Sequence, residues 1–200
     1  MLRIGVTGLM ASGKSTVARR FEERGAIRID GDALGWEALR IPAVRDRIAG
    51  AFGPEAIAGD GAVDRVRLGA VVFADRAAMA RLDAIVQPPL LALVRQSLDE
   101  ASAPVVILDA AMLARWGLDR EMDGVVEVTA PEPVRIARLR AARGYGAAEA
   151  ERRVRGQALP PLAAVKRHWL IVNDADAAAL RARADQVWSE IASLASAPRP

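Results

Sequence analysis

The sequence lacks cysteine, has a single histidine, and contains no long apolar run. Without cysteine the chain has neither disulfides nor thiolate metal sites. No run approaches the ~18 apolar residues of a membrane-spanning helix, and the apolar start of the chain is too short for a secretory signal. With 52% hydrophobic and 26% charged residues in 200, the composition is that of a folded globular chain. We therefore expect a cytoplasmic protein with no membrane partner.

Lysine is also scarce, because the 28 basic residues include only two lysines, Lys14 and Lys166. The net charge is only +3. Such an arginine bias, together with abundant alanine, indicates genome composition rather than nucleic-acid binding, so we expect no nucleic-acid partner. A mild attraction for anionic ligands still follows. Lys14 is informative, since this chain uses arginine almost wherever either residue would serve.

Short apolar stretches predict five strands, at 2–7, 26–30, 105–108, 124–128 and 169–173. Helical spacing lies between them, with a first helix at 13–24, a closing helix at 176–194 and a frayed tail at 195–200. Strands that alternate with helices favour an α/β fold, with a five-stranded parallel sheet flanked by helices on both faces.

Residues 31–102 interrupt this alternation with helical patterns near 34–49, 65–74 and 77–100. Pro88 and Pro89 are expected to bend or interrupt the last of these helices. We predict a core formed by 1–33 and 103–200, a helical lobe at 34–102, and a lid at about 138–165. The lid segment is arginine-rich and contains a break at 144–146.

The strongest signal is a glycine-rich stretch between the first predicted strand and the first predicted helix. Its residues, which match GxxxxGK[ST], are Gly8, Leu9, Met10, Ala11, Ser12, Gly13, Lys14 and Ser15. In such a loop the backbone N–H groups and the positive end of the following helix bind a polyphosphate. Lys14 would reach the β- and γ-phosphates, and the Ser15 hydroxyl would hold Mg²⁺. A structural glycine-rich turn is the alternative.

A phosphate-binding loop predicts a nucleotide but no particular reaction. The N-K-x-D motif by which GTPases read guanine is absent, and large motor ATPases usually need a longer chain. A helical insert after the second strand and a late arginine-rich segment instead favour a small-molecule kinase. In such an enzyme the insert binds the acceptor, and a basic lid closes over ATP and excludes water.

Three carboxylates follow predicted strands. Asp30 and Asp32 come after the second strand, and Asp109 ends the third. Ligands of parallel sheets bind beyond the carboxyl ends of the strands. We therefore assign Asp32 as the base that accepts the proton of the attacking hydroxyl, with Asp30 as a metal or supporting partner. Asp109 is a candidate Mg²⁺ ligand. The alternative for each is a turn or helix cap.

Arginines of the lid are candidates for phosphate binding, because a planar guanidinium binds phosphate through two donors. Arg135, Arg138, Arg140 and Arg143 recur at mixed helical spacing, and Arg138 and Arg143 could face the ATP phosphates. A solvated helix face is the alternative for any one of them. His168, the single histidine, is given no catalytic role.

In order and spacing, the motifs resemble the dephospho-CoA kinase family from about Ile4 to Asn173. The matching segments are 5–8 and 12–18, Ile29-Asp30-Gly31-Asp32, Phe52-Gly53 with Ile57, 60–65 with Leu68 and 72–73, Arg153-Val154-Arg155-Gly156-Gln157, and the strand that ends at Asn173. The resemblance implies a P-loop NTPase fold with a helical CoA lobe and a lid. It also implies phosphorylation of the ribose 3′-hydroxyl of dephospho-CoA by ATP.

By the same resemblance, Thr7 and Asp32 belong to the active site, residues 8–16 through Thr16 bind ATP, and Arg138 and Arg143 are the lid arginines. The chain departs from the family where Leu9 and Ala11 replace glycines, and at Gln87-Pro88, Ala111-Met112-Leu113-Ala114-Arg115 and Arg167-His168. The last three departures lie on the acceptor side or beside the lid. Two alternatives therefore stay open: a kinase for another acceptor, such as a nucleoside monophosphate, and a nucleotide-binding relative without turnover.

Overall fold

The computed structural model describes residues 1–163 and 165–196, with the side chains of 73 and 143 also left out. The expected tail beyond 196 lies outside the described residues. The chain divides into two compact units. One contains Met1–Asp30 and the chain from Glu100 onward, and the other is Gly31–Asp99.

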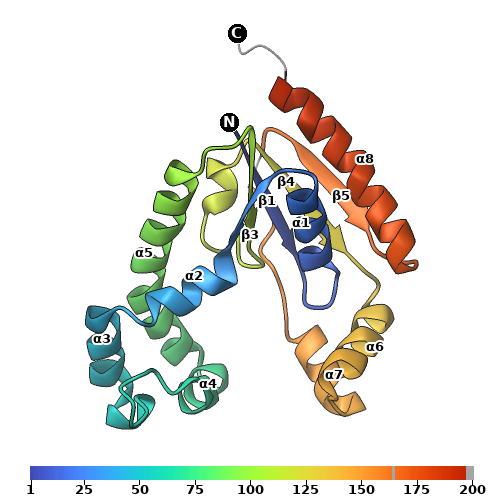
Figure 1. Ribbon diagram of the computed structural model, residues 1–200. Helices are drawn as coiled ribbons and strands as arrows, with labels where there is room; N and C mark the ends of the chain where they lie inside the picture. The colour runs from blue at the N-terminus through green and yellow to red at the C-terminus, as the bar shows by residue number, and fades with distance from the viewer. Residues whose placement is uncertain (164, 197–200) are drawn as a thin grey trace. The chain divides into compact units, whose positions relative to one another are not determined.

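The first unit is built on a parallel sheet of order β2-β3-β1-β4-β5 (Figure 1). Its strands are β1 (Leu2–Gly8), β2 (Ile27–Asp30), β3 (Val105–Asp109), β4 (Gly124–Thr129) and β5 (His168–Val172). All four pairings are parallel. The predicted five-stranded α/β fold is confirmed. The sequence pattern was informative because the central strands are buried on both faces and so consist of nearly unbroken apolar residues.

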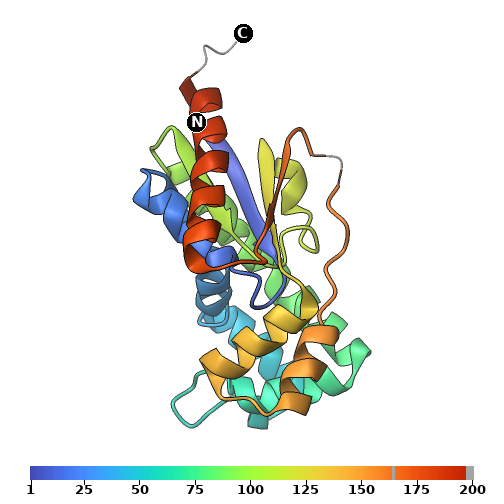
Figure 2. The same ribbon diagram turned by 90° about the vertical axis from the view of Figure 1, so that its right-hand side faces the viewer.

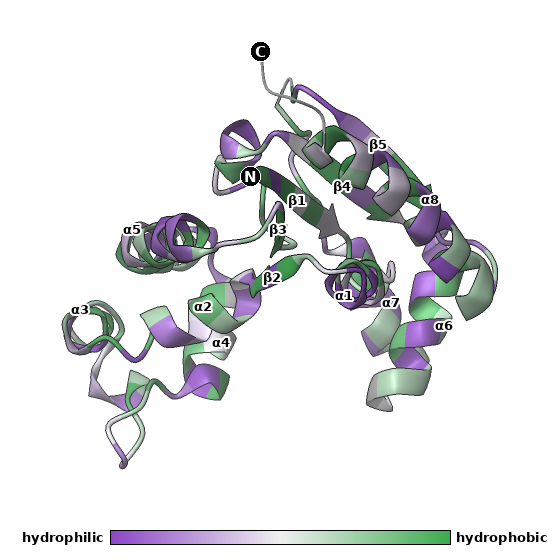
Figure 3. Cartoon of the chain, turned by 45° about the horizontal axis from the view of Figure 1, so that its top comes forward, coloured by the Kyte–Doolittle hydropathy of each residue, from purple (hydrophilic) through white to green (hydrophobic). Residues whose placement is uncertain are grey.

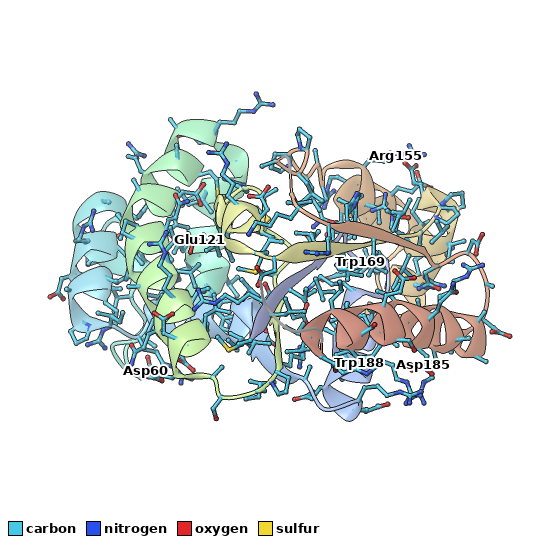
Figure 4. All side chains as sticks on the ribbon, turned by 90° about the horizontal axis from the view of Figure 1, so that it is seen from above. Asp60, Glu121, Arg155, Trp169, Asp185 and Trp188 are labelled. Carbon is cyan, nitrogen blue, oxygen red and sulfur yellow. The ribbon has the colours of Figure 1, made fainter. Side chains whose placement is uncertain are left out.

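Helices α1 (Lys14–Glu23) and α8 (Ala177–Ser196) cover one face of this sheet. Phe21 is fully buried, and its ring lies 5.7 Å from that of Trp188. Asp185 accepts hydrogen bonds from Arg20 and Arg24, and Figure 4 shows Asp185 and Trp188 on the side of α8 that faces α1. The hydrogen bonds from Arg20 and then Arg24 hold the pKa of Asp185 well below its usual range. Their contribution to stability is therefore present above the ordinary Asp pKa and is lost as the pH falls.

Helices α6 (Glu132–Arg143) and α7 (Ala147–Arg155) form an antiparallel pair that follows β4. Gly144 ends α6 at φ 66°, a left-handed conformation that favours glycine, and so produces the predicted break. Leu139, Ala150 and Val154 are buried between the two helices. Figure 3 shows α6 in bands of both colours, as expected for a helix with one buried face.

Two short segments complete the first unit. The 3₁₀ helix η2 (Leu118–Glu121) lies between β3 and β4. The chain from 156 to 167 contains no helix or strand among its described residues, and Figure 2 shows it as an extended run between α7 and β5. Asp119 is buried and accepts a 2.6 Å hydrogen bond from the Ala163 amide, which fixes this run against η2.

The second unit consists of helices α2 (Gly31–Ala38), α3 (Pro42–Phe52), α4 (Arg65–Ala74) and α5 (Arg76–Glu100), with the 3₁₀ helix η1 (Pro54–Ala56). Its core includes Val44, Ile48 and Leu68. The single helix predicted near 34–49 is wrong, since the structure has two. Pro42 restricts Ile41 to an extended conformation (φ −62°, ψ 123°), which ends one helix and starts the next.

Helix α5 runs through Pro88 and Pro89 without interruption, so a break at these prolines is also wrong. Each proline removes one backbone donor, but Ile85 and Leu90 on either side are buried and keep the helix packed. By length and composition alone, α5 is the one helix among the described residues that is apolar enough to cross a membrane. This is weak evidence, because a core helix with buried residues such as Val94 and Leu98 passes the same test.

Candidate active site

The phosphate-binding loop connects the end of β1 to the start of α1, as predicted. A Cβ on Gly8 would lie 2.4 Å from the backbone oxygen of Val128, so only glycine fits there. Gly13 has φ 100°, and a Cβ on it would lie 2.4 Å from Nδ2 of Asn173. Close approach of the backbone therefore requires glycine at position 8, and a left-handed conformation together with the nearby Asn173 side chain requires it at position 13.

Ala11 adopts φ 61° and is the single non-glycine residue with positive φ in the described chain. A left-handed conformation costs a residue with a Cβ roughly 1–2 kcal/mol. The methyl group is partly buried against the α6–α7 cluster, where Ile136 and Tyr145 also pack. Packing of the loop on these helices thus offsets the strain of an alanine where the family usually has glycine.

Lys14 is buried at the start of α1 and contacts the carboxylate of Asp109. Asp109 ends β3 and is 1% exposed. Its other oxygen accepts hydrogen bonds from Nε and Nη2 of Arg28, at 3.0 and 2.7 Å. Asp109 thus lies between two cations.

Arg28 was not singled out from the sequence. It lies on β2 beside β3, and it also donates a 2.8 Å hydrogen bond to Asp30. Burial lowers its pKa, but the hydrogen bond from Arg28 to Asp109 and the nearby carboxylates outweigh burial and hold the pKa above its usual value. A charged residue inside a short apolar strand, two positions before Asp30, is the sequence signal that could have identified it.

Asn173 connects the loop to the predicted lid. It is 3% exposed, and its Nδ2 donates a 2.7 Å hydrogen bond to the Ser12 carbonyl. Its Oδ1 accepts a 3.0 Å hydrogen bond from Nη2 of Arg138. Gln157, just beyond α7, accepts a hydrogen bond from the Met10 amide. Arg138 therefore lies at the loop, whereas the side chain of Arg143 is outside the described residues.

We expect Asn173→Asp to destabilise the protein, because an oxygen would replace the donor that faces the Ser12 carbonyl. Arg138 already bonds to Oδ1, so the new charge does not restore the lost bond. The free energy of unfolding should fall by about 1–3 kcal/mol, measured by urea unfolding. Asp174→Asn is the matched control and should cost under about 1 kcal/mol, because Asp174 forms an exposed ion pair with Arg183. Equal stabilities of the two variants would contradict the role of Asn173.

Several buried donors near this link have no partner among the described residues. They are Oγ of Ser12, Nε and Nη1 of Arg135, and Nη1 of Arg138. Arg135 is 7% exposed and precedes Arg138 by three residues on α6, so both side chains leave the same face of the helix. A buried guanidinium without an anion is unfavourable, so these donors are suited to an anionic ligand.

Thr7, on β1, lines a cavity of about 380 Å³. Its hydroxyl donates a 3.2 Å hydrogen bond to the Ala111 carbonyl. Ala111 and Ala114, from the segment that departs from the family, also line this cavity. So do Glu127 and His168, whose side chains lie 3.0 Å apart. The departures therefore shape the space next to Thr7.

The remaining predicted residues lie as follows. Asp30 ends β2 and pairs with Arg28. Asp32 is exposed in the first turn of α2 and belongs to the second unit. Ser15 is exposed in the first turn of α1. No group of three or more metal-binding side chains occurs in the residues that the structure describes.

The loop, the sheet order and the arginine-bearing helix pair define the class of this protein as a P-loop kinase of small molecules. Comparison with known proteins then identifies the family. The family model for dephospho-CoA kinase matches residues 2–179. The chain belongs to the dephospho-CoA kinase family.

Relatives cover essentially the whole chain. A dephospho-CoA kinase from Moorella thermoacetica is 37% identical over 207 aligned residues, which cover 100% of this chain and 97% of the relative. The crystal structure of TT1252 from Thermus thermophilus has a TM-score of 0.79 at 31% identity, and the alignment covers 94% of this chain and 97% of that one. Dephospho-CoA kinase from Campylobacter jejuni shares the fold, with a TM-score of 0.68 at 20% identity over 96% of this chain and 97% of that one.

Proposed function

We propose that this protein transfers the γ-phosphoryl group of ATP to the ribose 3′-hydroxyl of dephospho-CoA, giving coenzyme A and ADP. The observation that carries the proposal is the phosphate-binding loop that ends at Lys14, in a chain that belongs to the dephospho-CoA kinase family. We place the reaction in the cytoplasm.

The chain's own residues supply most of the chemistry. The amides of residues 8–16 bind the phosphates, and Lys14 moves from Asp109 to the transferring group. Arg138, already at the loop through Asn173, balances its charge together with Arg143. Asp32 accepts the proton of the attacking hydroxyl, and Thr7 helps to position the acceptor. Residues 34–102 form the acceptor lobe and about 138–165 the lid.

Mg²⁺ fits the donors that are present. The ion prefers oxygen ligands and keeps several waters, so one hydroxyl, one carboxylate and the nucleotide suffice. The Ser15 hydroxyl would hold it, and the Asp109 oxygen that now contacts Lys14 would become available when Lys14 leaves. When bound, the ion neutralises charge on the phosphates.

The test is a panel of acceptors with ATP and purified protein. Dephospho-CoA should be consumed, with the product carrying one added phosphate at the 3′ position by mass spectrometry. Preferential phosphorylation of a nucleoside monophosphate would instead support another acceptor, an alternative favoured by the changed residues Ala111 and Ala114 beside Thr7. ATP binding without ADP formation for any acceptor would reject a kinase.

Arg135→Met should have opposite effects on folding and on nucleotide binding. Methionine keeps an aliphatic side chain but removes a buried charge that has no anion among the described residues, so the empty protein should be as stable or more stable. The Kd for ATP should rise about 10–100-fold, since a hydrogen bond to a charged group contributes about 1.5–3 kcal/mol. Calorimetric titration and thermal unfolding measure the two effects.

The matched control for Arg135 is Arg140→Met, on the exposed side of the same helix. It should leave both quantities nearly unchanged. An ATP affinity that stays within twofold of the wild type in Arg135→Met would show that Arg135 does not face the nucleotide.

A further inference from the structure

The second unit contains a pocket of about 420 Å³ that lies wholly within Gly31–Asp99. Its walls include the indole of Trp36 and three guanidinium groups, those of Arg40, Arg45 and Arg65, with Asp60 as the single carboxylate. A pocket with three cations and one anion has an excess of positive charge. It therefore favours a ligand with at least two negative charges.

Trp36 and Arg65 form one wall of the pocket. The Arg65 guanidinium lies 3.9 Å from the centroid of the indole ring, in a cation–π contact. Trp36 is nevertheless 46% exposed. Asp64, beside Arg65, is occupied as the N-cap of α4, where it accepts hydrogen bonds from two amides. The contact holds an exposed aromatic surface and a cation together among the residues that line the pocket.

Arg45 and Arg40 supply the other positive charges. Nη1 of Arg45 donates a 2.9 Å hydrogen bond to the Gly61 carbonyl. Nε of Arg45 is buried and has no hydrogen-bond partner in the part of the chain that the structure describes. Asp60, which Figure 4 labels, accepts a hydrogen bond from the Ala62 amide and so belongs to its own turn. No ion pair is formed by Arg40, Arg45 or Arg65 within residues 1–163 and 165–196.

The unpartnered donor is the decisive observation. A buried N–H without an acceptor costs about 1–3 kcal/mol, and a guanidinium is well shaped to bind two oxygens of a phosphate. The side chain of Arg45 is anchored through Nη1, so its Nε is presented in a fixed direction. The pocket is thus preorganised for an anion that the nucleotide loop of the other unit does not account for.

We propose that this pocket binds the diphosphate group of an organic diphosphate ester, through Arg40, Arg45 and Arg65, with Trp36 against an adjoining part of the molecule. The diphosphate ester could come from two sources. One is the acceptor dephospho-CoA, whose two halves are joined by a diphosphate, and for this source the inference rests on the proposed function. The other source is a CoA-type diphosphate that binds as an effector.

The test compares the wild type with Arg45→Met and Arg40→Met, with Arg47→Met as a control on the exposed surface of α3. Binding of dephospho-CoA and of ADP-ribose is measured by calorimetry, and 4′-phosphopantetheine serves as a probe with one phosphate in place of the diphosphate. Each pocket variant should weaken both diphosphate esters at least tenfold, and Arg47→Met should not. The effect on 4′-phosphopantetheine should be smaller. Arg40 is exposed, so Arg40→Met should fold even if Arg45→Met does not.

Kinetics separate the two sources. A KM for dephospho-CoA that rises at least tenfold, with the KM for ATP within threefold, would identify the acceptor as the ligand. Weakened binding with an unchanged KM for the acceptor would identify an effector site. A third outcome separates the pocket from the proposed function. If the wild type phosphorylates another acceptor, and the variants still lose diphosphate binding, the pocket is supported and the proposed function is refuted. Unchanged diphosphate binding in both variants, or no binding by the wild type, would overturn the proposal.

Discussion

Lys14→Ala should reduce kcat for phosphoryl transfer about 10²–10³-fold. Lys14 is the cation that the loop can bring to the transferring phosphoryl group, and such a preorganised charge typically lowers the barrier by about 3–4 kcal/mol. Steady-state ADP release with dephospho-CoA as acceptor measures the loss. A rate within tenfold of the wild type would show that the loop lysine is not the electrostatic clamp.

The variant should remain folded, which makes the loss interpretable. Removing Lys14 leaves Asp109 with both hydrogen bonds from Arg28, so the buried carboxylate keeps a cation. We expect a fall of about 1–3 kcal/mol in the free energy of unfolding. Lys166→Ala is the matched control, because this lysine is exposed and forms only a long ion pair, 3.9 Å, with Asp123. It should change neither rate nor stability.

Asp32→Asn should lower kcat about 10²–10⁴-fold, the range typical of a general base. The Kd for ATP should change less than threefold, because the amide keeps the shape of the side chain and the loop itself is unaltered. Asp32 is exposed in the first turn of α2, where the loss of a negative charge at a helix N-terminus costs about 0.3–1 kcal/mol. Calorimetry and steady-state kinetics together measure this separation.

Asp30→Asn provides the comparison for Asp32, two residues along the same chain. Asp30 pairs with Arg28 and stands beside Asp109 in the sheet register. Its loss should therefore have a smaller effect on kcat than the loss of Asp32. Normal turnover by Asp32→Asn would refute its assignment as the base, and an equal loss in both variants would indicate a general electrostatic effect.

Much of the fold could be predicted because each strand is a short apolar stretch with turn residues at its ends. Val105–Leu108 is such a stretch, and the glycine motif after β1 has a local conformation that few other sequences need. The break at Ile41 was missed because the helical pattern continues through it. Pro88 and Pro89 bend or interrupt a helix by their own chemistry, but here they do not interrupt α5, since buried neighbours keep the helix continuous.

The phosphate-binding loop could be found from the sequence, but the long-range contacts that hold its residues in place could not. Arg28 and Asp109 are 81 residues apart, and they meet only because β2 and β3 are neighbours in the sheet. Asn173 reaches Ser12 across 161 residues for the same kind of reason. Contacts of this kind depend on strand order and register, which no local pattern encodes. The choice of phosphate-binding arginines was also difficult, since nearly all of the 28 basic residues are arginine and the sequence does not rank them.

The contact between Lys14 and Asp109 has a consequence for the end of the catalytic cycle. Asp109 balances the charge of Lys14, so under the proposed function an ATP phosphate would compete with this carboxylate for the ammonium group. After transfer, ADP no longer offers a γ-phosphate, and Asp109 competes again for the same ammonium. On this mechanism the carboxylate would take the place of the transferred phosphate at Lys14, which would favour the release of ADP.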